Sequence, residues 1–249
     1  MNKSGNTVPQ ARGLSKKRRW TLAVLLSLCL IAASYLAYEI VTFPDVAVLA
    51  RANPKSTAWM EMRAKEARAK GKRARRFQSW KPLPSISAGL KNAVLIAEDA
   101  AFFQHDGLDY DEIREAIKIN TEKMEFARGA STITQQLAKN LYLSPSRNPV
   151  RKLKELLLTV ALERHLSKRR IFEIYLNVIE WGDGVYGAEA AARTYYGKSC
   201  SDLSDEEAAA LAAVIINPRR YSPVQPNRRI RNRIARIKAQ MIKYRYYKN

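Results

Sequence analysis

An acidic pair at the end of an apolar segment is the first feature of this sequence that could do chemistry. Glu98 and Asp99 follow an apolar stretch that begins near Leu90, and Phe102 and His105 come soon after them. If a cleft encloses such a carboxylate, desolvation raises its pKa toward the working pH and makes it a better general base. Glu-Asp pairs at helix ends more often only cap the helix or face solvent, so this pair alone does not decide the chemistry.

A second polar cluster lies between Gly129 and Asn140. Ser131 is a natural N-cap, so the pattern predicts a helix from Thr132 onward. Uncharged hydrogen-bonding side chains at a helix N-terminus suit a polyhydroxylated or phosphorylated ligand, whereas an ordinary surface helix would use Glu and Lys. The uncharged side chains are Ser131, Gln135 and Gln136, and the cation Lys139 follows them on the predicted helix.

A third group combines cations with one carboxylate. Arg147, Arg151 and Lys154 lie close in sequence to Glu155. The cations could neutralise a pyrophosphate, and Glu155 could hold one of them in place. The ordinary explanation is an exposed ion pair between Arg151 and Glu155, which are four residues apart on a helix.

Histidine and cysteine contribute no recognisable metal site to the sequence. His105 and His165 lie far apart without a metal-binding spacing, and the pattern H-E-x-x-H does not occur. The two cysteines, Cys29 and Cys200, predict neither a disulfide framework nor a metal site.

The elements that must position these groups are predicted to be helices. Apolar residues recur at three- and four-residue spacing, and alternating strand patterns are scarce. We therefore expect an all-α domain over residues 85–225, followed by a basic helix over 226–249 and preceded by a juxtamembrane stalk over 39–84. The expected helical segments are Leu90–Ala101, Ile113–Met124, Ile133–Leu143, Val150–Leu166, Ile171–Ile179 and Leu203–Ile216.

One uncharged segment predicts a membrane anchor. Residues 20–38 carry no formal charge and are rich in Leu, Ala, Ile and Val. As a helix they would rise roughly 28 Å, about the thickness of the hydrocarbon core of a bilayer. The basic residues in 1–19 place the N-terminus in the cytoplasm by the positive-inside rule, so later residues would face outward. A cleaved signal peptide is the alternative, but the apolar run is long and no clear cleavage site follows it.

The net charge of +21 requires an acidic partner. Nucleic acid, anionic lipid head groups and a pyrophosphate-bearing substrate would all be attracted by such a charge. The basic residues concentrate in 63–76 and 228–248, which we interpret as surface stripes. A solvated helix face explains the first stripe about as well as lipid contact does.

Four blocks over about residues 80–220 resemble, in order, the signature motifs of the family 51 glycosyltransferases, which include the transglycosylase domain of penicillin-binding proteins. The blocks are Glu98-Asp99-x-x-Phe102-x-x-His105-x-Gly107, Gly129-x-Ser131-Thr132-Ile133-Thr134-Gln135-Gln136-x-x-Lys139-Asn140, Arg151-Lys152-x-x-Glu155 and Ile171-x-Glu173-x-Tyr175-Leu176-Asn177. The chain ends at Asn249 and leaves no room for a transpeptidase domain, so the resemblance is to monofunctional members.

The resemblance implies a lysozyme-like helical domain that polymerises lipid II on the outer face of a bacterial inner membrane, as an inverting hexosyl transferase. Undecaprenyl pyrophosphate would be the leaving group. Lipid II, the growing glycan strand and membrane lipids are the implied partners, without nucleic acid, and proteins of cell-wall synthesis or division are further candidates. A divalent cation, Mg²⁺ or Mn²⁺, is expected at the donor pyrophosphate, without an organic cofactor.

The resemblance also assigns roles to individual residues. Glu98 matches the catalytic base, and Glu155 matches a second essential carboxylate. The positions that match substrate-binding residues fall into three groups: Lys139, Arg147 and Lys154 at the pyrophosphate, Ser131, Gln135 and Gln136 at sugar or phosphate oxygens, and Asp99 and Phe102 in the first block.

Two other functions remain open on the residues alone. A lytic transglycosylase or lysozyme-type hydrolase would share a helical fold and a catalytic Glu, but it would leave the cations around Glu155 unexplained. A basic membrane-anchored scaffold or nucleic-acid-binding protein would account for the charge. The outward topology and the lack of a DNA-binding motif count against it.

Overall fold

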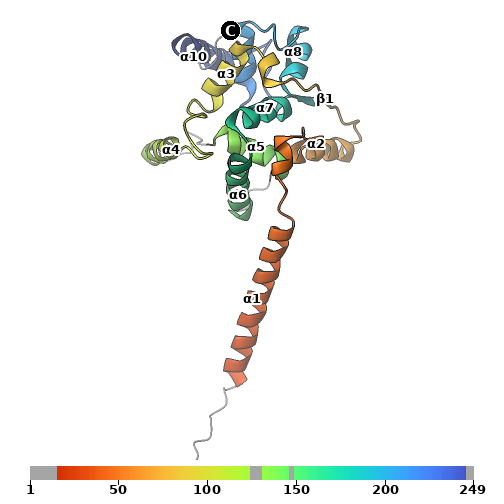
Figure 1. Cartoon of the computed structure of the whole chain (residues 1–249), viewed down its shortest axis with the longest axis vertical. Coiled ribbons are helices and arrows are strands. Elements are labelled where there is room, and N and C mark those ends of the chain that lie inside the picture. The colour runs from red at the N-terminus through yellow and green to blue at the C-terminus, as the bar shows by residue number, and fades with distance from the viewer. Residues whose placement is uncertain (1–15, 124–130, 146–148, 245–249) are drawn as a thin grey trace, which may run out of the picture. The chain divides into compact units, whose positions relative to one another are not determined.

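The computed structural model describes residues 16–123, 131–145 and 149–244, which divide into two units, Met1–Asp45 and Val46–Asn249 (Figure 1). The first unit contains the helix α1, Lys16–Val41. Large apolar side chains of α1 are exposed, including Leu26, Leu30 and Ile31. Over the residues that the structure describes, no helix combines the length and apolar character needed to cross a membrane. The predicted span at 20–38 is therefore helical but is not confirmed as a span.

The second unit is built mostly from helices, as the sequence predicts. Each helical segment expected from apolar spacing is confirmed within a few residues. Side-chain caps fix several starts, because Ser87, Ser167 and Ser204 each accept a hydrogen bond from a backbone N–H of the following turn. The helices are α2 Ala58–Ala69, α3 Ala88–Glu98, α4 Tyr110–Lys123, α5 Ile133–Tyr142, α6 Pro149–His165, α7 Lys168–Val178, α8 Ala188–Tyr196, α9 Asp205–Val214 and α10 Arg228–Lys243, with 3-10 turns at Ala47–Ala50 and Leu83–Ser85.

Two helices lie at the centre of the packing. Helix α3 packs against α9 and α10, and α5 packs against α2, α6 and α7. Leu90 and Val94 of α3 are fully buried, and alanines such as Ala208 and Ala212 on α9 allow the helices to approach closely. This packing brings the end of α3 close to the beginning of α5, where the first two candidate clusters lie.

A small sheet completes the second unit and was not predicted. Strands β1 (Phe77–Gln78), β2 (Glu180–Gly182) and β3 (Val185–Tyr186) pair in the order β1-β3-β2. The contact between β1 and β3 is parallel, and that between β2 and β3 is antiparallel. Strands of two or three residues are too short to produce an alternating pattern, so their sequence gives no signal.

The boundaries of the compact unit differ from the expected domains at both ends. Residues 46–84, expected as a stalk, belong to the second unit, where α2 packs against α5 and β1 pairs with β3. The expected basic C-terminal helix, α10, also packs into this unit. Ile230, Ile237 and Met241 bury its apolar face against α3 and α9. An apolar face of three residues among many arginines was too weak a signal to place the helix.

Candidate active site

Glu98 is the last residue of α3, and its side chain is 12% exposed. The helix ends there because Asp99 adopts an extended φ of −167°. The Glu98 carboxylate accepts hydrogen bonds from Nε2 of Gln136 at 3.0 Å and from a guanidinium nitrogen of Arg233 at 2.9 Å. Residues from the end of α3, α5 and α10 therefore meet at one carboxylate.

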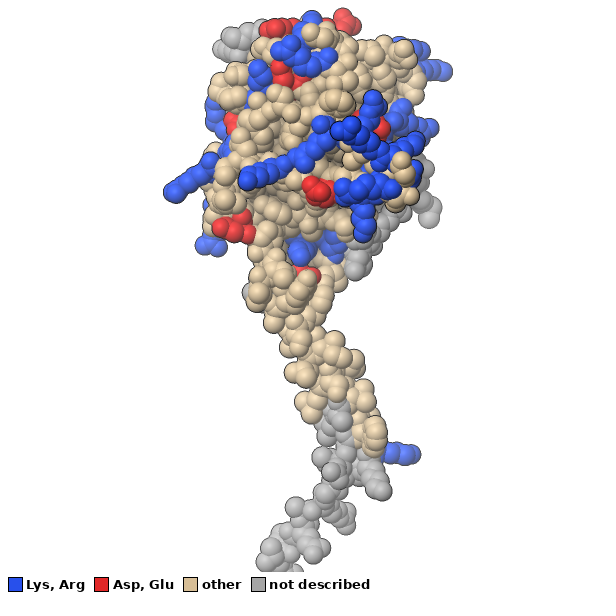
Figure 2. Space-filling model, turned by 90° about the vertical axis from the view of Figure 1, so that its right-hand side faces the viewer, with Lys and Arg blue, Asp and Glu red and all other residues tan. Residues whose placement is uncertain are grey.

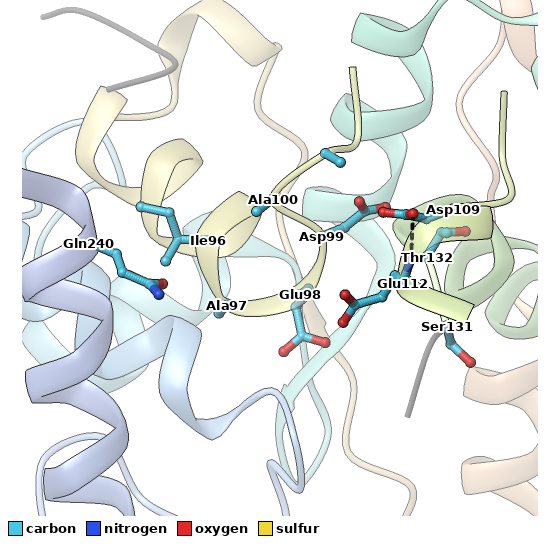
Figure 3. A pocket seen from close by; sticks show the side chains of 11 residues that line it. Ile96, Ala97, Glu98, Asp99, Ala100, Asp109, Glu112, Ser131, Thr132 and Gln240 are labelled. Carbon is cyan, nitrogen blue, oxygen red and sulfur yellow. Dashed lines mark hydrogen bonds between the residues drawn. The ribbon is translucent and has the colours of Figure 1, made fainter. Parts of the chain in front are cut away.

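A cavity of about 360 Å³ opens beside Glu98. Figure 3 shows the Glu98 carboxylate directed away from α3 into this hollow, which Ser131 and Glu112 also border. A substrate hydroxyl in the cavity could reach the carboxylate without any rearrangement of the residues that line the cavity. The group is thus enclosed, as a general base requires, and accessible.

Burial raises the pKa of Glu98. The hydrogen bond from Gln136 and the positive charge of Arg233 act in the opposite direction. The positive charge of Lys139 lowers the pKa as well. Desolvation therefore makes the carboxylate more basic than an exposed Glu, while its neighbours keep the charged form accessible.

A hydrogen bond from Tyr175 holds the side chain of Gln136 in one orientation. The hydroxyl of Tyr175 donates to Oε1 of Gln136 at 2.8 Å, so the amide NH₂ faces Glu98. Tyr175 is fully buried, and its burial raises the pKa of the phenol well above the usual value, so the hydroxyl keeps its proton. Tyr175 belongs to the fourth sequence block, and from α7 it supports the site through Gln136.

Asp99 also lines the cavity, and its hydrogen bonds fix the backbone around it. Its carboxylate accepts from the backbone N–H of Ile133 at 2.9 Å and from Nε2 of His105 at 3.0 Å. Nδ1 of His105 accepts a hydrogen bond from the N–H of Gly107 at 3.1 Å, so Nε2 is the ring nitrogen that donates to Asp99. Asp99 thereby joins the end of α3 to the first turn of α5.

Asp99, His105 and Asp109 each place one possible ligand atom within 4.8 Å of the others, a spacing that could hold a cation. Both ring nitrogens of His105 are already used, and Asp109 accepts from the backbone N–H of Glu112. Internal hydrogen bonds thus explain this cluster without an ion.

The start of α5 differs from the prediction by one residue. Thr132, not Ser131, is the N-cap, and it forms a reciprocal capping box with Gln135. The Thr132 hydroxyl also donates to the backbone oxygen of Gly107 at 2.7 Å, which selects it over Ser131 as the cap. Gln135 is therefore buried in the cap, whereas Ser131 is exposed on the cavity wall.

Glu155, on α6, is buried, and a cluster of cations surrounds it. Its carboxylate accepts from Arg151 at 2.8 Å and from Lys152. Lys139 lies within electrostatic range of both Glu155 and Glu98. Burial lowers the pKa of Lys139, and the negative charge of Glu155 opposes that shift. The charge of Lys139 thus interacts with both predicted catalytic carboxylates.

Lys139 also lines a second hollow of about 290 Å³, together with Gln136 and Asn140. Glu98 borders the first hollow, and its partner Gln136 borders the second. The hydrogen bond between Glu98 and Gln136 therefore links a residue of the first hollow to a residue of the second.

Three further predicted residues have different surroundings. Phe102 is fully buried against Phe172, with Lys168 above its ring. It therefore packs in the core and supports the first motif from inside the protein. Lys154 is half-buried on α6, one residue before Glu155. Arg147 lies outside the described residues.

The surroundings of Glu155 do not favour the expected divalent cation. The described side chains that bind this carboxylate, Arg151 and Lys152, are cations, and a metal ion would have to displace them. Two carboxylate oxygens already neutralised by cations are a poor ligand set for Mg²⁺ or Mn²⁺. The metal requirement therefore stays a prediction.

Arg233 is the site residue that the sequence analysis missed. It lies 135 positions from Glu98, in a stretch where Arg is frequent. Its one distinguishing signal is its place on the face of an amphipathic helix next to Ile230 and Ile237.

Comparisons with known proteins agree with this geometry. A family model described as transglycosylase matches residues 44–242. Proteins named biosynthetic peptidoglycan transglycosylase are similar over most of this chain. The relative from Nitrosospira multiformis is 46% identical over 82% of this chain and 87% of its own length. That from Dechloromonas aromatica is 45% identical over 82% and 87%, and that from Methylobacillus flagellatus is 44% identical over 90% and 96%.

Proposed function

Because this chain belongs to the transglycosylase family, we propose that it is a peptidoglycan glycosyltransferase that polymerises lipid II into β-1,4-linked glycan strands. The observation that carries the proposal is the enclosed Glu98 beside the cationic Lys139 and the Glu155 cluster. Glycan strand synthesis for the bacterial cell wall is the activity that the relatives' names describe.

Glu98 serves as the base in this reaction. It removes the proton from the 4-hydroxyl of the acceptor sugar as that oxygen attacks the anomeric carbon of the donor. The bond from that carbon to the pyrophosphate oxygen breaks, and the pair of electrons leaves with undecaprenyl pyrophosphate. The attack inverts an α link into a β-1,4 link, and the leaving group needs no acid because it is already ionised.

The cations stabilise the negative charge of the leaving group. Lys139 lies near both carboxylates, so it can offset the charge that develops on the departing oxygen. Arg147 and Lys154 are proposed to share this role on the resemblance of their positions. Glu155 holds Arg151 and Lys152 in place, which makes it an orienting carboxylate.

Polar side chains around Glu98 complete the proposed site. Ser131 on the cavity wall is proposed to bind sugar or phosphate oxygens. Gln136 positions Glu98, while Gln135, Asp99 and Phe102 shape the backbone and core behind it.

The proposed enzyme is a cell-envelope protein anchored by one helix, with a cytoplasmic N-terminus and a lysozyme-like catalytic domain in the periplasm. The uncharged run 20–38 and the exposed leucines of α1 support the anchor. A polyprenyl substrate cannot leave the bilayer, so the enzyme must meet it there.

Polymerisation of labelled lipid II by the full chain tests the proposal. We expect Glu98→Gln to keep the fold, because the amide retains the shape, but to lower turnover by about two to four orders of magnitude. Glu206→Gln, which removes an exposed carboxylate from α9, is the matched control and should keep normal turnover. Near-normal turnover by Glu98→Gln would disprove the assigned role.

A second substrate separates synthesis from cleavage. The same preparations should leave finished peptidoglycan sacculi intact. Release of soluble muropeptides from sacculi, without polymer from lipid II, would instead identify a lytic enzyme.

A further inference from the structure

A basic groove lies beside the second hollow of the site. This groove, here called the α2 groove, has a volume of about 160 Å³ and begins at the C-terminal half of α2. Figure 2 shows the side of the second unit that carries α2, where Lys and Arg spread across the surface with few acidic side chains among them. The charged residues that line the groove are Arg63, Lys70, Lys72, Arg73, Arg75, Arg219, Glu66 and Asp183.

Two of the groove's arginines are neutralised within the protein. Arg63 pairs with Glu180 at 3.2 Å and with Glu66 at 3.0 Å. Arg219 pairs with Asp183 at 3.1 Å and lies 3.6 Å from Glu66. These pairs account for both acidic residues that line the groove.

The other four basic side chains of the groove carry positive charge that no described carboxylate neutralises. Within the described part of the chain, no carboxylate forms an ion pair with Lys70, Lys72, Arg73 or Arg75. A concave surface with uncompensated positive charge attracts carboxylates or phosphates. The groove therefore has the charge of a binding surface for an acidic ligand.

The groove adjoins the hollow that contains Lys139. Arg63 and Arg219 line both the groove and the hollow that contains Lys139 and Gln136. A polymer held near Lys139 could thus extend past these two arginines into the groove.

The backbone that carries the surplus cations is fixed. The N–H of Lys72 bonds to the backbone oxygen of Ala67, which closes the turn after α2. Gly184 has a φ of +73°, and a Cβ there would lie 2.7 Å from the backbone oxygen of Arg75. Only glycine allows this approach, and the N–H of Phe77 then bonds to the backbone oxygen of Gly184 at 2.8 Å.

We propose that the α2 groove binds the acidic peptides carried by the glycan strand that the enzyme extends. This inference rests on the proposed function, because each repeat of a peptidoglycan strand bears a peptide with free carboxylates. A membrane surface is also anionic, but it is flat. A groove that adjoins the hollow containing Lys139 fits a peptide branch of the bound polymer better.

A charge-matched pair of full-length variants tests the proposal. The groove variant combines Lys70→Gln, Lys72→Gln and Arg73→Gln. The control variant combines Arg228→Gln, Arg229→Gln and Arg236→Gln, which removes three exposed charges from α10. Each is assayed with lipid II that has free peptide carboxylates and with lipid II whose carboxylates are converted to neutral amides.

We expect the groove variant to raise KM on the order of 3- to 10-fold and to shorten the strands with the acidic substrate. The control variant should behave like the unaltered protein, and the amidated substrate should be used equally by all three. Added salt should raise the KM of the unaltered protein for the acidic substrate more than for the amidated one. This salt comparison needs no mutation, so it holds even if the groove variant misfolds.

Several outcomes would overturn the proposal. Equal losses with both substrates, or equal losses in both variants, would show that peptide charge is not recognised in the groove. Normal polymerisation by the groove variant with weaker binding to anionic vesicles would assign the groove to the membrane surface. Lack of polymer from the unaltered protein with either substrate would remove the proposed function as well.

Discussion

At the scale of single residues, the state of Glu98 depends on opposing effects. Burial favours the neutral carboxyl, whereas Arg233 and Gln136 favour the carboxylate. A charge buried without a partner would be very costly, so the contact with Arg233 allows an enclosed glutamate to remain ionised. The reactive group is therefore maintained by a residue of the last described helix.

Arg233→Gln should shift the pH dependence of polymerisation. Arg233 lowers the pKa of Glu98, so its loss raises that pKa further. Because the base must be deprotonated, the rate falls as pH decreases through this pKa, and the acidic limb of log(kcat/KM) against pH should move to higher pH. The measurement is the pH–rate profile with lipid II. Arg236→Gln, an exposed change on α10, is the control, and an identical acidic limb in both variants would contradict the role given to Arg233.

The candidate site residues were predictable from the sequence to different degrees. Glu98, Gln136 and Lys139 fall within short motifs, where residue type and spacing are informative. Tyr175 also falls within a motif, but its contact with Gln136 joins residues distant in sequence, as does the contact of Arg233 with Glu98. Such contacts arise only when α3, α5, α7 and α10 pack together. No local pattern records that arrangement.

At the scale of elements, the first turn of α5 carries much of the site. Thr132 caps the helix and also bonds to Gly107, while Asp99 binds the N–H of Ile133. The position of Gln136 depends on these contacts because it lies on the next turn.

Thr132→Ala should lower the free energy of unfolding by about 1–2 kcal/mol, since it removes a capping box at a buried helix start. Urea unfolding of the full chain measures this change. Thr132→Ser keeps the hydroxyl and should recover most of the loss. If the Ala and Ser variants are equally stable, the cap is not the source of the effect.

Helix prediction succeeded where apolar periodicity was long and failed where it was short. The helices α3 and α7 have clear apolar faces, but α8 is largely alanine and follows a turn-rich stretch. The strands are set by pairing of Phe77 with Val185, residues that lie more than a hundred positions apart. These elements are determined by tertiary packing, so local sequence patterns could not predict them.

At the scale of the whole molecule, the net charge of +21 serves more than one purpose. Some cations are paired inside the site, others line the α2 groove, and the N-terminal ones precede the proposed anchor. The link between the strong positive charge and acidic partners stays a prediction, and the value of the charge alone could not tell these uses apart.

Two arginines inside the proposed anchor should release the protein from membranes. Leu26→Arg with Leu30→Arg places charges near the middle of 20–38, at a cost of about 2.5–3.5 kcal/mol each in a bilayer. The double variant should move from the membrane pellet to the soluble fraction after carbonate extraction. Trp20→Arg with Val41→Arg, near the ends, should stay in the pellet because long side chains there can reach water. Equal recovery of both variants in the pellet would argue against the anchor.

The hydrogen-bond chain behind Glu98 has a consequence for the proton that the reaction releases. Tyr175 donates to Gln136, and Gln136 donates to Glu98, so every link on the inner side already carries its hydrogen. A proton captured by the glutamate cannot travel inward along this chain. We expect it to return to water through the cavity beside Glu98, the side from which the acceptor sugar is proposed to approach.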